Sequence, residues 1–217
     1  MAVLRRRIEE VKQGPRLPIL MLDAMCPGQR LEFDSNDRRL PVMCEAGEVA
    51  VVGVWNSQPL RYGVTAELKQ LGPDRWELKA RDHVRVIGPA EREDDGVTFV
   101  RLEYVKDKVG KVDVEMAELL ADLVEEWRGL VEGSPFEKFK GQIRGVLADL
   151  GPMPAAEDAG AVALWVAALV NPLPGLGVAY EIRPGALSAE SVFDRLKVVT
   201  SGIRSSIGHV SGKRPLF

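Results

Sequence analysis

The sequence predicts an α+β fold with a strand-rich N-terminal part and a helical C-terminal part. Between Leu17 and Asp107 a glycine or proline interrupts the chain every few residues, which leaves room for short strands but not for long helices. After Lys111 the spacing of the apolar residues changes to a period of 3.6, which is typical of amphipathic helices. We therefore predict a β subdomain at 1–110 and a helical subdomain at 111–217.

Four segments of the first part have strand patterns: 49–55, 64–71, 76–86 and 97–105. Several short strands of this kind are typical of a small barrel or sandwich. The turn signal Gly72-Pro73-Asp74 separates two of these segments. It predicts a hairpin between 67–71 and 76–79.

The second part has four predicted helical segments. An amphipathic helix covers 116–131, and a second helix runs from Ser134, its N-cap, to Gly151. Residues 161–170 are apolar on every side, so this helix should lie at the centre of the subdomain, with Trp165 as its largest side chain and Asn171-Pro172 as its stop. A last helix begins near Ser188 and carries one apolar stripe to Val210.

Composition argues against several classes of protein. The chain has 29 basic and 32 acidic residues and a formal net charge of -3, so we expect no general binding of nucleic acid. The longest apolar run, at 161–170, is half of the roughly 20 residues that cross a bilayer in a helix, so we expect no membrane span. We interpret Cys26 and Cys44 as buried thiols of a reducing compartment, the cytoplasm.

No catalytic or cofactor motif is present in the sequence. It lacks a phosphate-binding loop, a nucleophile elbow and a zinc-protease helix. We interpret the acidic run around Glu93 as solvated and His83 as a hydrogen-bonded structural residue, and we expect no enzyme activity, metal or cofactor. A hydrolase made of scattered residues, with His83 beside a nucleophile in a deep pocket, stays open as an alternative.

The chain contains an ordered set of short blocks, at 17–22, 26–28, 53–54, 63–68, 81–86, 102–107, 164–173 and 188–196. In this order the blocks resemble the N-terminal substrate-binding domain of Lon proteases. It implies a pseudobarrel of strands related to PUA-like barrels, packed against a helical subdomain. Because 217 residues leave no room for the ATPase and peptidase domains of a full Lon, we expect a free-standing recognition domain or a part of a larger ligase-type protein.

The resemblance also implies a non-enzymatic module that captures unfolded or damaged polypeptides, or an adaptor in protein quality control. Its expected partners are such polypeptides and a protease or ubiquitin-ligase component. Such a module would use exposed apolar surface and free strand edges. Our candidate contact residues are Trp55, Tyr62, Trp76 and Met25, although each also suits a barrel core; Trp55 is favoured because it ends its strand beside a polar loop. The alternative is a PUA-like RNA or nucleotide binder, which would have to gather its basic residues on one face.

Overall fold

The computed structural model describes residues 14–170 and 179–212. The described residues form two compact units. The first, called the β unit here, comprises 14–25 and 30–105; the second, called the helical unit, comprises 26–29, 106–170 and 179–212. The architecture is the α+β fold that the sequence predicts. The boundary between the units falls near residue 106, and the short segment 26–29 joins the helical unit.

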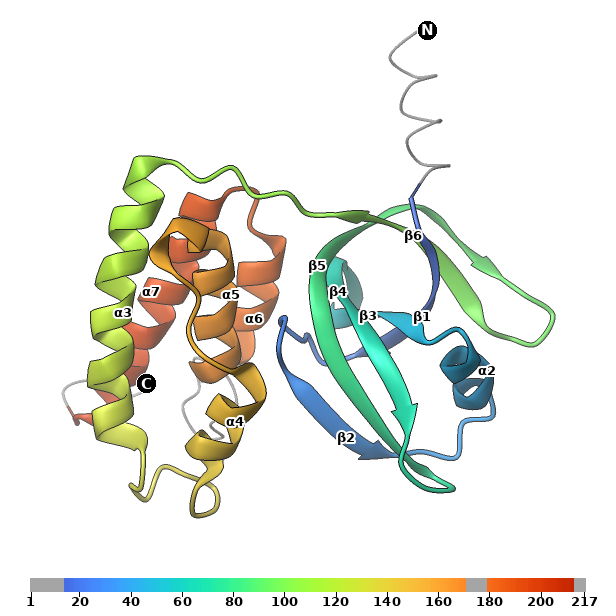
Figure 1. The fold of residues 1–217 in the computed structure, drawn as a ribbon, viewed down its shortest axis with the longest axis horizontal. Helices are drawn as coiled ribbons and strands as arrows, with labels where there is room; N and C mark the ends of the chain where they lie inside the picture. The colour runs from blue at the N-terminus through green and yellow to red at the C-terminus, as the bar shows by residue number, and fades with distance from the viewer. Residues whose placement is uncertain (1–13, 171–178, 213–217) are drawn as a thin grey trace, which may run out of the picture. The chain divides into compact units, whose positions relative to one another are not determined.

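The β unit is built from one mixed sheet that closes on itself (Figure 1). Its strands are β1 (Arg16–Leu22), β2 (Arg30–Asp34), β3 (Glu48–Trp55), β4 (Gln58–Gln70), β5 (Arg75–Arg92) and β6 (Thr98–Tyr104). The strand order is β2-β5-β4-β3-β1-β6, and an additional β5–β6 pairing completes the ring. Among the strands of the described residues, β1 and β3 pair in parallel and the other pairings are antiparallel. The expected pseudobarrel is therefore confirmed.

The length of β5 makes this closure possible. Its 18 residues pair with β4 from Trp76 to Arg85 and with β6 from Val84 to Arg92, so this one strand joins β4 to β6 and closes the ring. The predicted hairpin is confirmed, since Gln70 of β4 pairs with Trp76 of β5 across the turn.

The interior of the barrel is a small apolar core. Ala50, Val84, Val100 and Leu102 are buried there, and Leu17, Ile19 and Val86 pack against them. These side chains come from four strands, and their apolar aliphatic groups fill the narrow interior of the barrel.

The β unit also contains a short helix that the strand pattern does not predict. Helix α2 (Arg39–Glu45) lies between β2 and β3 and buries Leu40 and Met43. Pro41 stands near its start, where the missing N–H of proline removes no helical hydrogen bond. This proline, expected as a break between strands, instead lies in the first turn of a helix.

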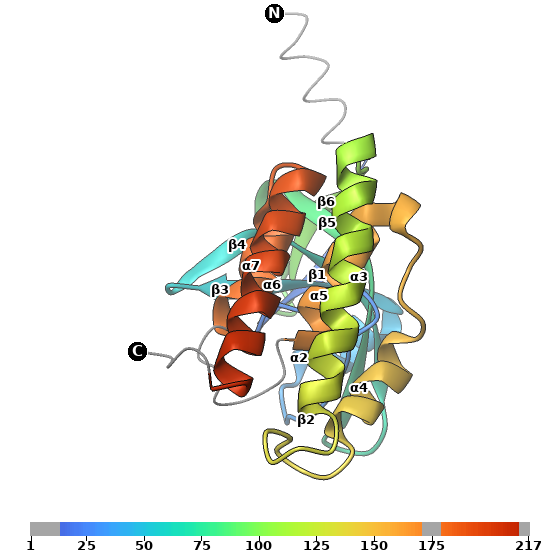
Figure 2. The same ribbon diagram turned by 90° about the vertical axis from the view of Figure 1, so that its left-hand side faces the viewer.

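The helical unit contains α3 (Lys111–Val131), α4 (Gln142–Leu150), the single turn η1 (Ala156–Asp158), α5 (Ala159–Val170), α6 (Ala179–Ser188) and α7 (Val192–Val210). As predicted, α5 is the centre of this unit: apart from Ala161, each of its residues is buried. Trp165 is 7% exposed and donates from Nε1 to the Gly151 carbonyl at 3.2 Å. Figure 2 shows α3 beside α7, where Trp127 donates to Ser206 Oγ at 2.8 Å inside the core. The predicted stop at Asn171-Pro172 lies outside the described residues.

The helix predicted from Ser134 is wrong in its first half, because α4 begins only at Gln142. Gly141 has φ +83°, a left-handed conformation that interrupts a helix. The Glu137 carboxylate accepts hydrogen bonds from the N–H groups of Gly133, Gly141 and Ile143 at 2.9, 3.4 and 2.8 Å. It therefore holds a loop in this segment and satisfies the first N–H groups of α4.

The last predicted helix begins later than Ser188. That residue ends α6, a helix with Pro184 inside it, which the apolar spacing does not predict. Ser191 is the N-cap of α7, and its side chain accepts from the Asp194 N–H at 3.1 Å.

A buried ion pair ties the start of the helical unit to α7. Arg195 is 1% exposed; its Nη1 lies 2.6 Å from Asp107 Oδ2 and its Nε donates to the Ala186 carbonyl at 3.1 Å. Gly160 of α5 faces this pair so closely that a Cβ there would lie 1.9 Å from Asp107 Oδ2. Glycine is therefore required at 160 by space, although it weakens a helix.

Within the described part of the chain, no helix is long and apolar enough to cross a lipid bilayer.

The Gly160 site yields a first prediction. Gly160→Ala should destabilise the protein, because the new methyl group displaces Asp107 from Arg195 and leaves a buried guanidinium without its carboxylate, a loss of about 3–5 kcal/mol when such a pair is broken. Gly129→Ala in α3 is the matched control, because no neighbouring atom lies within 4 Å of its Cβ position; it should stabilise by about 0.5–1 kcal/mol. Urea unfolding measures both, and two stabilised variants would contradict this account of Gly160.

A second prediction concerns pH. The N–H of Ile143, then those of Gly133 and Gly141, hold the pKa of Glu137 below its ordinary value of 4.5. Because the folded pKa is depressed, the charged carboxylate stabilises the fold fully above pH 4.5, and this contribution disappears as the pH falls through the lower folded pKa. Glu137→Gln should therefore be less stable than the parent at pH 7 and approach it in stability at low pH. A stability difference independent of pH in thermal unfolding would contradict this role.

Candidate functional site

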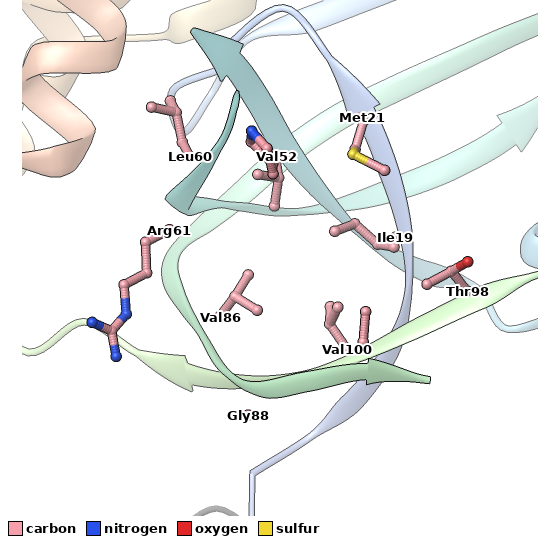
Figure 3. A pocket seen from close by; sticks show the side chains of 11 residues that line it. Ile19, Met21, Val52, Leu60, Arg61, Val86, Gly88, Thr98 and Val100 are labelled. Atoms are coloured by element: carbon pink, nitrogen blue, oxygen red, sulfur yellow. The ribbon is translucent and has the colours of Figure 1, made fainter. Parts of the chain in front are cut away.

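An open pocket lies at one end of the barrel. The β unit contains an apolar pocket of about 370 Å³ at this end (Figure 3). It is lined by residues of five strands: Ile19, Met21, Val52, Pro59, Leu60, Arg61, Val86, Gly88, Ala90, Thr98 and Val100. Its volume lies within the range of about 300–1,000 Å³ that is typical of ligand sites.

The pocket has an apolar floor and an apolar mouth. Ile19, Val52, Val86 and Val100 point into the same space from four strands (Figure 3). Val100 belongs to the barrel core, and Ile19 and Val86 pack against that core. The pocket therefore lies directly beside the core. Met21 follows Ile19 on the same face of β1 and is 58% exposed. A large apolar side chain in water beside a hollow is typical of a binding surface.

The pocket opens where two strands part. The pairing of β4 with β5 ends at Tyr62 and Arg85, yet β4 reaches back to Gln58 and β5 continues to Arg92. These two lengths, which no longer pair with each other, supply pocket residues on facing sides: 59–61 from β4, and Val86, Gly88 and Ala90 from β5. We call this opening the seam.

Glycines shape both sides of the seam. Gly88 has φ +76°, which favours glycine, and the β5–β6 register shifts between Ile87 and Glu91 around it. At the bulge of β3, a Cβ on Gly53 would lie 2.7 Å from the Cβ of Ala24 and 3.0 Å from Leu60 Cδ1. The absence of a side chain at 53 thus allows Leu60 to lie at the pocket.

Arg61 is the charged member of the lining. Among the described residues it forms no ion pair. Other arginines of the β unit differ in this respect, since each of the following pairs with an aspartate or glutamate: Arg16, Arg30, Arg39, Arg75, Arg81 and Arg85. The seam therefore combines an apolar hollow with one positive charge that has no carboxylate partner in the described part of the chain.

The residues predicted from sequence lie elsewhere. Trp76 is 1% exposed and donates from Nε1 to the Ser35 carbonyl at 3.1 Å, and Met25 is 4% exposed. Both are core residues in this structure and present no side chain to the surface. Trp55 and Tyr62 are half-buried. None of the four lines the pocket.

Trp55 and Tyr62 nevertheless flank the pocket residues in sequence. Trp55 ends β3 and pairs with Gln58 across a turn in which Asn56 and Ser57 have φ values of 48° and 61°. Positive φ at both central positions is typical of a tight type I′ hairpin turn. Tyr62 stands at the last β4–β5 pair, with its ring 5.8 Å from that of His83.

The candidate chemical groups do not gather at the pocket. His83 lines neither the barrel pocket nor a second pocket, of about 560 Å³, between α3, α4 and α5 in the helical unit.

The Cys26 thiol is fully buried, and burial raises its pKa to about 12 against the opposing effect of Arg183 and Arg195. Cys44 is only half-buried, contrary to our expectation, and its Sγ lies 3.3 Å from the Leu68 carbonyl. In the described ranges no three His, Cys, Asp or Glu side chains cluster as a metal site would require.

The sequence matches no protein-family model and no curated protein. Solved structures do resemble the fold. A Lon N-terminal domain protein from Xanthomonas campestris aligns with a TM-score of 0.54 at 16% identity, covering 86% of this chain and 98% of the other. The N-terminal domain of a Lon protease from the Mycobacterium avium complex aligns with a TM-score of 0.56 at 14% identity, covering 88% and 98%. Barrel, helical unit and chain order together show that this protein has the fold of a Lon N-terminal domain.

Proposed function

We propose that the chain is a polypeptide-binding module that captures unfolded or damaged proteins at the open end of its barrel. One observation carries the proposal: an apolar pocket opens at the seam and has the exposed Met21 at its mouth. Unfolded chains expose apolar side chains that folded proteins bury. An apolar pocket with an apolar rim therefore binds non-native proteins in preference to native ones. The fold supports the same function, since one structural neighbour is a domain of a Lon protease.

In this proposal the chain acts as a recognition element or adaptor, without chemistry of its own. It would deliver its client to a protease or a ubiquitin-ligase component. The apolar pocket supports a role in binding without catalysis, because its lining offers no nucleophile with an adjacent base. We place the module in the cytoplasm, where its two free thiols, Cys26 and Cys44, would stay reduced.

Nucleic acid is the weaker candidate ligand. Binding a phosphate backbone needs arginines and lysines that are free to face it. In the β unit six arginines pair with carboxylates of the same unit, which reduces the positive potential that RNA would meet. This ion pairing favours polypeptide over RNA as the ligand.

The proposal predicts selective capture that depends on the pocket mouth. The immobilised protein should retain reduced, carboxymethylated lactalbumin and release native lactalbumin. Met21→Asp should lower that retention about tenfold, because a charge replaces an apolar contact. Val112→Asp is the matched control: Val112 is 57% exposed, close to the 58% of Met21, but lies in the first turn of α3, where an acid is tolerated. Equal retention of both forms, or equal losses in both variants, would contradict the proposal.

Two tryptophan variants distinguish a residue that contacts the ligand from a residue of the core. Trp55→Ala should weaken capture while the melting temperature changes little, because this half-buried ring stands at a hairpin end. Trp76→Ala should instead cost about 3–5 kcal/mol of stability, because its ring is buried. Differential scanning calorimetry alongside the retention assay checks both variants. A large loss of stability in Trp55→Ala would assign Trp55 to the core.

A further inference from the structure

We propose that the seam receives an extended peptide as an added strand on β4, with one apolar side chain in the pocket and an acidic residue beside Arg61. This inference rests on the proposed function and specifies how the polypeptide binds. It concerns the length 58–61 of β4, where pairing with β5 has stopped.

The backbone of β4 offers free groups at this place. In the tight turn after Trp55, the N–H of Gln58 faces β3, as in any hairpin closed by a turn. Backbone groups alternate sides along a strand, so the carbonyl of Pro59 and both backbone groups of Arg61 face the seam. Proline has no N–H to donate. The edge therefore presents two acceptors and one donor, which an extended peptide backbone satisfies and an apolar small molecule does not.

The pocket lies where a side chain of that strand would point. Side chains of an added strand alternate between the two faces of the sheet, and the inner face at this edge is the hollow lined by Val52, Val86 and Val100. The lining is apolar, so a valine, leucine or isoleucine side chain fits its chemistry and a charged one does not.

Arg61 adds a charge preference. Its guanidinium has no carboxylate partner among the described residues, although it stands in a unit where other arginines do. Arg61 contributes to the pocket lining, but its side chain is exposed to solvent. An exposed side chain of β4 lies beside the exposed residues of a neighbouring strand. An aspartate or glutamate next to the apolar residue of the peptide would therefore meet Arg61.

Titration of the 217-residue protein with synthetic peptides tests the inference. The parent is a nonapeptide of alternating threonine and valine with aspartate at the central threonine position. Two further peptides carry N-methyl groups on the valine amides or on the threonine and aspartate amides, which block one edge each and keep every side chain. We expect at least one methylated peptide to bind about tenfold more weakly than the parent, because main-chain hydrogen bonds are lost.

Two protein variants locate the peptide. Arg61→Gln should weaken the parent peptide about two- to fivefold, the range of an exposed ion pair, and should leave a peptide with asparagine for aspartate unaffected. Arg38→Gln is the control, because Arg38 is exposed in the β unit and does not line the pocket. Met21→Asp should weaken the parent peptide and the asparagine peptide alike, because both place valine in the pocket.

The outcomes separate the two proposals. Equal binding of the parent and both methylated peptides would overturn strand addition, and so would capture of denatured lactalbumin without binding of any peptide; the proposed function would survive either result. An unchanged affinity in Arg61→Gln would overturn the acidic preference. Retention of neither peptide nor denatured protein would overturn the proposed function itself.

Discussion

The closure of the sheet by β5 is the constraint on which the rest of the β unit depends. The 18 residues of β5 pair with β4 along one edge from Trp76 to Arg85 and with β6 along the other edge from Val84 to Arg92, so Val84 and Arg85 pair with both strands. Where β5 leaves β4, the first residues of β4 keep only β3 as a neighbour. The length of β5 that closes the ring with β6 beyond Arg85 therefore faces the seam with its other edge, and Gly88 supplies a left-handed conformation where the β5–β6 register shifts.

The helical unit depends on a different interaction, the buried pair of Arg195 and Asp107. A charge that is 1% exposed is tolerated because a carboxylate and the Ala186 carbonyl surround it. Such a pair adds little net stability compared with apolar packing, but it penalises arrangements in which the partners separate. It therefore fixes the segment after β6 against α5 and α7, at a position where Gly160 leaves room for it.

Local signals in the sequence sufficed for much of the fold. The Gly72-Pro73-Asp74 turn and the apolar spacing of α3 and α5 depend on neighbouring residues, so they could be interpreted without tertiary information. The errors arose where contacts between distant or competing residues decide the structure: Glu137 holds a loop instead of a helical turn, and α6 contains Pro184.

The pocket could not be predicted from the sequence, because it too depends on contacts between distant residues. Its lining comes from five strands, and without the register no pattern shows that Met21 and Leu60 meet. Our candidates followed residue type, which favours large aromatics, and the structure buries Trp76 as barrels usually do.

A closed barrel and a peptide-binding edge impose opposite demands. An exposed edge pairs with any extended chain, including another copy of the same protein, so natural sheets cover their edges or close them. Here the ring covers much of the backbone of β1, β3, β4, β5 and β6, and at the seam two short lengths, 58–61 of β4 and 86–92 of β5, have no strand partner on one side. Pro59 removes one donor from that edge, and the charge of Arg61 repels a second copy of the same edge. A short edge with a hollow beside it can hold one strand and cannot propagate a sheet, which suits a module whose ligands are themselves prone to aggregate.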